Sequence, residues 1–246
     1  MAAEGMAWNG SASQEDFMKR DEVILVDEQD RMTGSDSKHK AHTFNSEQPR
    51  GLLHRAFSVF LFDDDNQLLL QRRANSKITF PGVWTNTCCS HQLHGYEPSE
   101  IDSDAEVSSG FVPGAKRAAV RKLGHELGIP KGQLPMEAFK YLTRLHYCAA
   151  DTDTYGPNAE WGEHEIDYIL FVKARVSLEP NMDEVEEARY VTEVELQQMM
   201  KPDSGLKWSP WFRIIAERFL HRWWQDLGQT IGSDDHVDLA RIHKVL

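Results

Sequence analysis

Residues 114–130 read GAKRAAVRKLGHELGIP, and this stretch predicts the central helix of the fold. Apolar residues recur every fourth position on one helical face, namely Ala119, Leu123 and Leu127. Gly128 and Pro130 end the pattern, because glycine adopts the left-handed C-cap conformation and proline cannot continue a helix. Lys122 and Glu126 share a neighbouring face, so the helix has an apolar side for a core and a charged side next to it.

Strands lie on both sides of this helix in the sequence. Residues 21–34, DEVILVDEQDRMTG, predict a short strand and a turn, and residues 52–74 predict two strands joined by an Asp/Asn turn. The segment AFSVFLF is apolar on both faces, which is typical of a central strand. Residues 161–178, WGEHEIDYILFVKARVSL, predict a strand with carboxylates alternating onto one side: Glu163, Glu165 and Asp167.

Two helices are predicted near the C-terminus. Residues 192–200 open with a capping box from Thr192 to Glu195. In residues 209–228, Ser209 is the expected N-cap, Pro210 the first helical residue and Gly228 the residue that ends the helix. The Asp/Ser-rich residues 100–110, EIDSDAEVSSG, resemble an exposed insertion.

Composition limits the class of protein. A chain of 246 residues with 40% hydrophobic content can bury a sizeable core, so we expect a disordered lead over residues 1–20 and one domain over residues 21–246. A degenerate plastid transit peptide is the alternative for the lead, although such peptides are usually poor in acids. A net charge of -12 argues against duplex nucleic acid as the main partner. We see no apolar run of about 20 residues that could span a bilayer.

Residues 85–97, TNTCCSHQLHGYE, place two adjacent cysteines near two histidines. The residues alone leave open a metal clip, a redox pair or a nucleophile beside a ligand. Adjacent cysteines rarely bond to each other and a total of three leaves an odd one, so a reducing compartment such as the cytosol is expected.

Other candidate groups are ambiguous when taken alone. Glu163 and Glu165 lie about 7 Å apart along a strand, where a metal could draw them together, but two acids alone are more typical of a solvated strand face. The histidines His42, His54 and His91 lack the close spacing of a zinc finger. The cations Lys38, Arg72, Arg73 and Lys77 suit either a solvated face or a phosphorylated small molecule.

Five blocks, taken together and in order, resemble the type I isopentenyl-diphosphate delta-isomerases of the Nudix superfamily. They are LLHRAFSVFLF, ITFPGVWTNTCCSH, RKLGHELGIP, WGEHEIDYILF and SPWFRII. The resemblance runs from about Glu22 to the end, and the extended ends with a Trp223-Trp224 helix are similar to the eukaryotic branch. It implies an α/β (α+β) fold of Nudix type, in which a mixed sheet lies between helices, with extra N- and C-terminal elements.

The sequence departs from that of Nudix hydrolases at the Nudix box, G-x5-E-x7-R-E-U-x-E-E-x-G-U, in which U is an aliphatic residue. Lys122 and His125 stand where hydrolases have glutamates, and the insertion interrupts the first half of the box. Hydrolases use those acids to hold magnesium and activate water. The family resemblance therefore implies that a diphosphate is bound without being cleaved, and a Nudix hydrolase is the alternative.

The resemblance also implies the site residues for moving the double bond of isopentenyl diphosphate to give dimethylallyl diphosphate. The catalytic residues are Cys89, Glu165 and Tyr147. One zinc or manganese ion would be held by His42, His54, His91, Glu163 and Glu165. A magnesium ion tied to Glu126 would bridge to the diphosphate. The substrate-binding residues are Lys38, Arg73, Lys77, Lys122 and Trp211.

A role in isoprenoid and sterol precursor synthesis follows from the same resemblance, with a monomer or weak dimer that has no stable membrane insertion. The expected location is the cytoplasm. The alternatives are the plastid and, from the C-terminal HKVL, the peroxisome.

Overall fold

Strand β3 (His54–Phe62) runs through the middle of the sheet, and every one of its residues is buried. Its side chains alternate between two hydrophobic cores, so that Phe57 and Val59 lie in one core and Phe60 lies in the other. The strand pairs in parallel with β8 (Gly162–Lys173) and antiparallel with β6 (Cys88–His91). The central position predicted from its two apolar faces is therefore confirmed.

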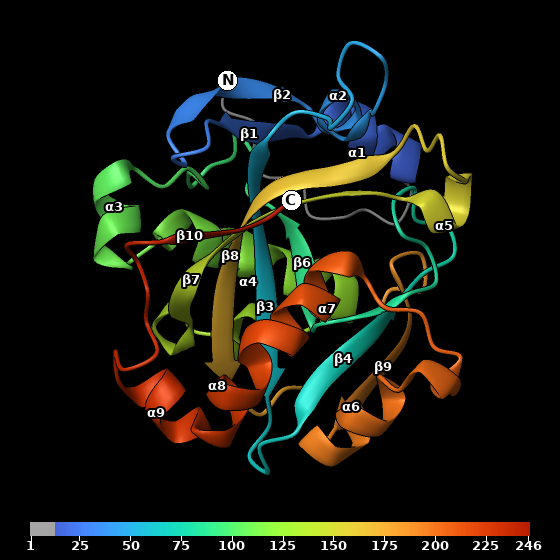
Figure 1. The fold of residues 1–246 in the computed structure, drawn as a ribbon. Coiled ribbons are helices and arrows are strands. Elements are labelled where there is room, and N and C mark those ends of the chain that lie inside the picture. The colour runs from blue at the N-terminus through green and yellow to red at the C-terminus, as the bar shows by residue number, and fades with distance from the viewer. Residues whose placement is uncertain (1–12) are drawn as a thin grey trace.

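The computed structural model describes residues 13–246 of the chain, and these form one ten-stranded sheet (Figure 1). The other strands are β1 (Glu22–Val26), β2 (Met32–Ser37), β4 (Leu68–Arg73), β5 (Trp84–Thr85), β7 (Lys140–Ala150), β9 (Val185–Val191) and β10 (Ile242–Val245). The main order is β10-β7-β8-β3-β1-β2, with β4 and β6 also paired to β3, and with β5 and β9 paired to β4. Because β10 and β7 also pair in parallel, the sheet is mixed, as expected of this fold class.

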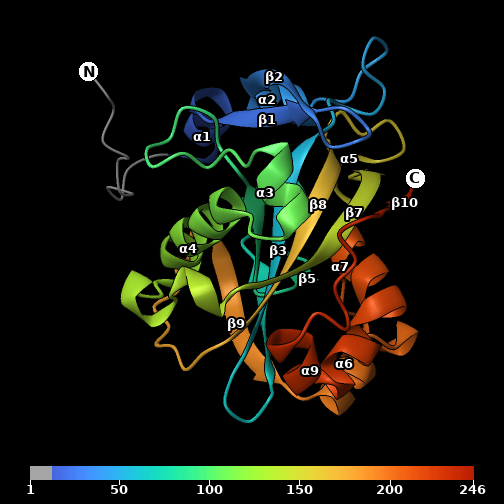
Figure 2. The same ribbon diagram turned by 90° about the vertical axis from the view of Figure 1, so that its left-hand side faces the viewer.

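Helices cover both faces of the sheet, with α4 on one side and α6, α7 and α9 on the other (Figure 2). Their bounds are α1 (Gln14–Arg20), α2 (Lys38–His42), α3 (Asp104–Ser109), α4 (Pro113–Leu127), α5 (Thr152–Tyr155), α6 (Glu193–Met199), α7 (Pro210–Ile215), α8 (His221–Gln225) and α9 (Leu227–Gly232). A π-helical segment, Ala216–Leu220, joins α7 to α8. Among residues 13–246, no helix has the length and apolar character to cross a bilayer.

Helix α4 follows the sequence pattern closely. Its apolar face lies fully buried in one core through Ala119, Leu123 and Leu127. Gly128 has a φ of 65° and donates its N–H to Gly124 O, which ends the helix in the left-handed conformation. The capping box from Thr192 to Glu195 and the Ser209 cap are also confirmed, at α6 and α7.

Three local predictions need correction. Part of the expected disordered lead is the helix α1, which Ser13 caps and which buries Met18; residues 1–12 lie outside the described part of the chain. The supposed exposed insertion over residues 100–110 contains α3, and Glu100 and Asp102 are buried because they bind Arg121 and the first amides of α4.

The third correction concerns the end of the C-terminal helix. Gly228 does not stop it: α8 already ends at Gln225, and Gly228 lies within α9. The break falls at Asp226, whose ψ of 36° is not helical, whereas Gly228 does not have the positive φ of a glycine stop.

A buried ionic network ties the β1–β2 turn to the sheet. The Asp30 carboxylate accepts hydrogen bonds from Arg55, Arg144 and the hydroxyl group of Tyr168. The side chains of Asp30 and Arg55 are 0% exposed. Removing the carboxylate charge would leave two guanidinium groups in a buried place without their shared anion.

We expect Asp30→Asn to lower the free energy of unfolding by roughly 3–5 kcal/mol, the usual cost of breaking a buried ion pair. Asparagine tolerates the positive φ of 66° at this position, so the change isolates the charge. Denaturant unfolding measures the loss. The control is Asp64→Asn, whose side chain is 68% exposed, and it should change stability by less than about 0.5 kcal/mol. A similar small change for both variants would contradict the prediction.

Candidate active site

Five side chains from α2, β3, β6 and β8 converge on one buried cluster. Their ligand atoms all lie within 4.8 Å of one another, and they belong to His42, His54, His91, Glu163 and Glu165. The strand register explains the convergence, because β3 pairs His54 with Glu165 and, two residues on, pairs Ala56 with His91. The structure thus brings together the whole set that the resemblance implied for one metal ion.

Hydrogen bonds behind two imidazoles point their free nitrogens into the cluster. Nδ1 of His42 lies 2.6 Å from Lys38 O, and Nδ1 of His54 lies 2.8 Å from Leu52 O. A carbonyl oxygen only accepts, so each Nδ1 carries a proton, and in the neutral imidazole that binds metals the other nitrogen, Nε2, carries the lone pair.

Those lone pairs have no proton donor in the cluster. Nε2 of His42 lies 2.8 Å from Glu163 Oε2, yet both atoms are buried without a hydrogen-bond partner, as is Nε2 of His54. Buried acceptors that face one another are satisfied by a cation. Imidazole nitrogens with carboxylate oxygens suit a divalent transition metal, so the residues present fit such an ion.

Glu165 contacts Tyr147, which lies outside the cluster, as well as His91 within it. Its Oε2 accepts a hydrogen bond from the hydroxyl group of Tyr147, and its Oε1 lies 2.8 Å from His91 Nε2. Burial alone would raise the pKa of Glu165, but the neighbouring His54 and the hydrogen bond from Tyr147 lower it. Burial raises the pKa of Tyr147 well above its usual value, so the phenol keeps its proton and continues to donate.

The adjacent cysteines point to opposite faces of β6. Cys88 is fully buried in the core that includes the apolar face of α4, whereas Cys89 is half-buried and packs against the other core. Arg73 Nη1 lies 3.7 Å from the Cys89 sulfur. Burial raises the pKa of Cys89 to about 12 despite the nearby Arg73, so the thiol is protonated at neutral pH.

Cys89 shares a face with the histidine cluster. It lies two residues before His91 on β6 and pairs with Ser58 of β3. Because β6 and β8 flank β3, the strands that carry Cys89 and Glu165 are separated by about 10 Å, two strand spacings. A thiol and a carboxylate therefore lie on one face of the sheet, on the two strands that flank β3, offset by four residues along it because Glu165 pairs with His54.

Aromatic rings lie near this thiol. Trp211, at the start of α7, is 3% exposed and donates its indole N–H to Asn86 Oδ1. Its ring centroid lies 5.6 Å from that of Phe80 and 6.1 Å from that of Tyr147. The guanidinium carbon of Arg73 is 5.5 Å from the centroid of the same indole, so one cation already lies over this aromatic face.

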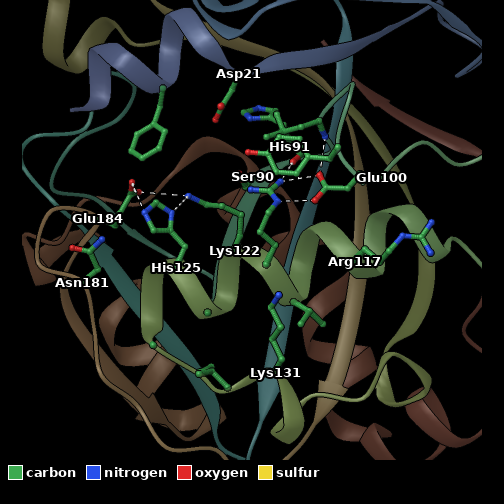
Figure 3. A pocket seen from close by; sticks show the side chains of 18 of the residues that line it. Asp21, Ser90, His91, Glu100, Arg117, Lys122, His125, Lys131, Asn181 and Glu184 are labelled. Atoms are coloured by element: carbon green, nitrogen blue, oxygen red, sulfur yellow. Dashed lines mark hydrogen bonds and ion pairs between the residues drawn. The ribbon is translucent and has the colours of Figure 1, made fainter. Parts of the chain in front are cut away.

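A cavity of about 1340 Å³ borders His91, and Figure 3 shows Lys122 among the side chains that line it. Lys38, Lys77 and Lys122 line it. Burial and the charges of the other two lysines lower the pKa of Lys38 to about 8. An ammonium group whose pKa is lowered by cationic neighbours is suited to an anionic ligand. Arg73, predicted with these lysines, instead bonds the carbonyl groups of Thr79 and Phe80 next to Cys89.

Glu126 lies on α4, outside the histidine cluster. It is 2% exposed, and its carboxylate lies 3.1 Å from Lys122 Nζ and accepts a hydrogen bond from Gln71. Burial would raise its pKa, but Lys122 and Lys77 lower it to about 2, so it is charged. A magnesium ion at this carboxylate remains a prediction.

Sequence reasoning missed several residues that shape the site. Thr79 donates to Glu163, and Asp151 accepts the backbone N–H of Phe80, which has a φ of 49°. Glu184 contacts Lys77 and Lys122. The Phe80-Pro81-Gly82 turn was a usable signal for the loop, but we find no sequence signal for Glu184.

Known proteins with this sequence pattern identify the family. A model described as the NUDIX domain matches residues 52–212. The isopentenyl-diphosphate delta-isomerase of Gibberella zeae is 48% identical over 233 residues, which cover 94% of this chain and 86% of that one. The chain belongs to the isopentenyl-diphosphate delta-isomerase family of the Nudix superfamily.

Other members of the isomerase family are similar over most of the chain. Isopentenyl-diphosphate delta-isomerase 1 of Bos taurus is 48% identical over 221 residues, covering 89% of this chain and 91% of its own. The chloroplastic isopentenyl-diphosphate delta-isomerase II of Arabidopsis thaliana is 44% identical over 240 residues, which cover 95% of this chain and 78% of that one. The crystal structure of DR0079 from Deinococcus radiodurans is similar in fold alone, with a TM-score of 0.50 and 14% identity over 81% of this chain and 99% of that one.

Proposed function

We propose that this chain catalyses the reversible isomerisation of isopentenyl diphosphate to dimethylallyl diphosphate. The observation that carries the proposal is the placement of a protonated thiol, Cys89, and a buried carboxylate, Glu165, on the two strands that flank β3. The relatives from Gibberella zeae and Bos taurus carry the name of this activity.

The reaction needs an acid and a base on either side of a five-carbon chain. One proton is added to the terminal CH₂ of the double bond, which leaves a tertiary carbocation at the branched carbon. The other proton is then removed from the carbon that lies between this centre and the carbon bearing the diphosphate. Cys89 and Glu165 are the two proton-transfer groups, and they exchange roles when the reaction reverses.

The surroundings of these groups fit a short-lived cation. Indole and phenol faces stabilise a desolvated positive charge, and the neighbouring rings of Trp211 and Tyr147 would supply such faces. Their burial keeps water from adding to the cation, which would give an alcohol instead of the isomer. The lysines of the adjoining cavity would hold the diphosphate.

Hydrolysis of the diphosphate is disfavoured by the side chains of α4. Lys122 and His125 occupy two positions where Nudix hydrolases carry metal-binding glutamates, and Lys122 is ion-paired to the neighbouring Glu126. A positive charge at this place opposes a cluster of magnesium ions around an attacking water.

The histidine cluster would hold one zinc or manganese ion, through His42, His54, His91, Glu163 and Glu165. When bound, such an ion supplies a positive charge that makes the carboxyl group of Glu165 a stronger acid. Glu126 would hold a magnesium ion that accompanies the substrate diphosphate. We further propose a cytoplasmic enzyme, monomeric or weakly dimeric, that supplies isoprenoid and sterol synthesis.

The test is turnover of isopentenyl diphosphate with magnesium in heavy water. We expect dimethylallyl diphosphate that carries deuterium, seen by NMR, and no release of phosphate or diphosphate. Phosphate release without isomer would overturn the proposal in favour of a hydrolase. Binding without either product would leave a diphosphate-binding protein with no isomerase activity.

Trp211 gives a separate test of the carbocation. We expect Trp211→Leu to reduce kcat by about thirtyfold, because a cation over an indole gains about 2 kcal/mol that leucine cannot supply. Trp211→Phe keeps an aromatic face and should lose only part of the rate. Steady-state kinetics on folded protein measures both variants. Equal rates for the two would mean that the indole only packs α7 against the sheet.

A further inference from the structure

Glu184 is a buried carboxylate at the edge of the lysine cavity, immediately before β9. It is 3% exposed. Its backbone is fixed, since its N–H donates to Asn181 O and its carbonyl oxygen accepts from the N–H of Ala74. A buried carboxylate with a rigid backbone is costly unless its charge is matched, so its partners indicate its role.

Two lysines provide the matching charge. Glu184 Oε2 forms an ion pair with Lys77 and lies 3.8 Å from Lys122 Nζ. The second oxygen, Oε1, accepts a hydrogen bond of 2.9 Å from Gln14 of α1. Figure 3 shows Glu184, Lys122 and His125 pointing towards one another across the cavity. The Glu184 carboxylate thus links Lys77 and Lys122 to α1.

Lysine side chains are long and flexible, and three ammonium groups that share a cavity repel one another. Without an anion, Lys77 and Lys122 would turn outward or lose protons. Glu126 forms an ion pair with Lys122. Among the described residues, Glu184 is the carboxylate that forms an ion pair with Lys77. The charges of Glu126 and Glu184 raise the pKa of Lys122 against the effect of burial.

We propose that Glu184 is a positioning residue for diphosphate binding: it holds Lys77 and Lys122 in the cavity in the orientation that the ligand needs. Glu184 acts through the lysines and does not itself bind the anion, since a carboxylate repels a diphosphate. The inference rests on the proposed function only in taking the bound anion to be a diphosphate.

The test measures the Kd of inorganic diphosphate with magnesium by calorimetry, which needs no turnover. We expect Glu184→Ala to weaken binding about tenfold, the typical effect of losing one charge-assisted hydrogen bond. Glu184→Gln keeps the size and one accepting oxygen, so it should lose about threefold. With isopentenyl diphosphate, KM should rise by similar factors while kcat changes little, which a general loss of folding would not produce.

Two further comparisons separate positioning from other roles. In a Lys77→Ala background, Glu184→Ala should lose much less than tenfold, because the lysine with which Glu184 forms its shorter ion pair is gone and only the 3.8 Å contact with Lys122 is left. The matched control is Glu186→Ala on β9, whose carboxylate bonds Asn75 and lies 3.7 Å from Arg72, and it should bind normally.

Several results would overturn the proposal. Unchanged or tighter diphosphate binding in Glu184→Gln would mean that the carboxylate only competes with the ligand. A full tenfold loss in the Lys77→Ala background, or an equal loss in the Glu186 control, would also exclude positioning. Failure of isomerase turnover with these binding effects intact would count against the proposed function and leave the role of Glu184 standing.

Discussion

We expect Cys89→Ser to lower kcat by roughly 10²- to 10⁴-fold, the usual contribution of a positioned acid or base. A serine hydroxyl group has nearly the shape of the thiol but gives up its proton far less readily. The neighbouring Arg73 should remain in place, since it is held mainly by the carbonyl groups of Thr79 and Phe80. KM should therefore change little. Initial rates of isomer formation, with KM measured in parallel, test this expectation.

The other two cysteines are the controls for this prediction. Cys148→Ser should keep the parent rate, because its sulfur faces Arg50 O on the opposite side of β7 from Tyr147. Cys88→Ser should keep the parent rate per folded molecule, with some loss of stability from a hydroxyl group in an apolar core. Equal losses of rate in Cys88→Ser and Cys89→Ser would point to a folding effect and contradict the catalytic role.

His54→Ala and Glu163→Gln should each remove the bound transition metal and abolish most activity, with kcat at least about 100-fold lower. The basis is the cluster geometry, in which both residues offer a buried atom without a hydrogen-bond partner to the same point. Elemental analysis of the purified variants gives the metal content, and isomer formation gives the rate. Adding zinc or manganese in excess should restore part of the activity by mass action.

His164 provides a matched control because it lies between Glu163 and Glu165 in the chain. Its ring points to the other face of β8, where its Nε2 lies 3.0 Å from that of His146. His164→Ala should keep the metal and the rate. Full metal content and full rate in His54→Ala would make the cluster a packing feature and nothing more. Metal loss with an unchanged rate would separate the ion from catalysis.

Local patterns in the sequence were sufficient to predict the central strand β3 and helix α4, but not α1, α3 or the helix break at Asp226. The four-residue spacing of Ala119, Leu123 and Leu127 depends on helix geometry alone, and the apolar faces of β3 depend on strand alternation. Lys122 and Glu126 are one turn apart, and their ion pair follows from the same geometry.

Contacts between distant segments could not be predicted in this way. His42, His54 and His91 meet because β3 pairs with both β6 and β8, and that register is a tertiary property. Their assignment to one cluster came from the family resemblance. Glu184 was missed because its partners, Lys77 and Lys122, lie on other elements. The burial of Glu100 likewise depends on Arg121, which is distant in sequence.

The alternation of β6 determines how the enzyme withstands oxidation. Cys88 and Cys89 project from opposite faces, so their sulfurs cannot join in a disulfide while the strand is intact. Peroxides and alkylating agents attack the thiolate, and a pKa raised to about 12 leaves very little thiolate at Cys89. The burial that keeps a transferable proton on the sulfur therefore also lowers the reactivity of Cys89 towards peroxides and alkylating agents.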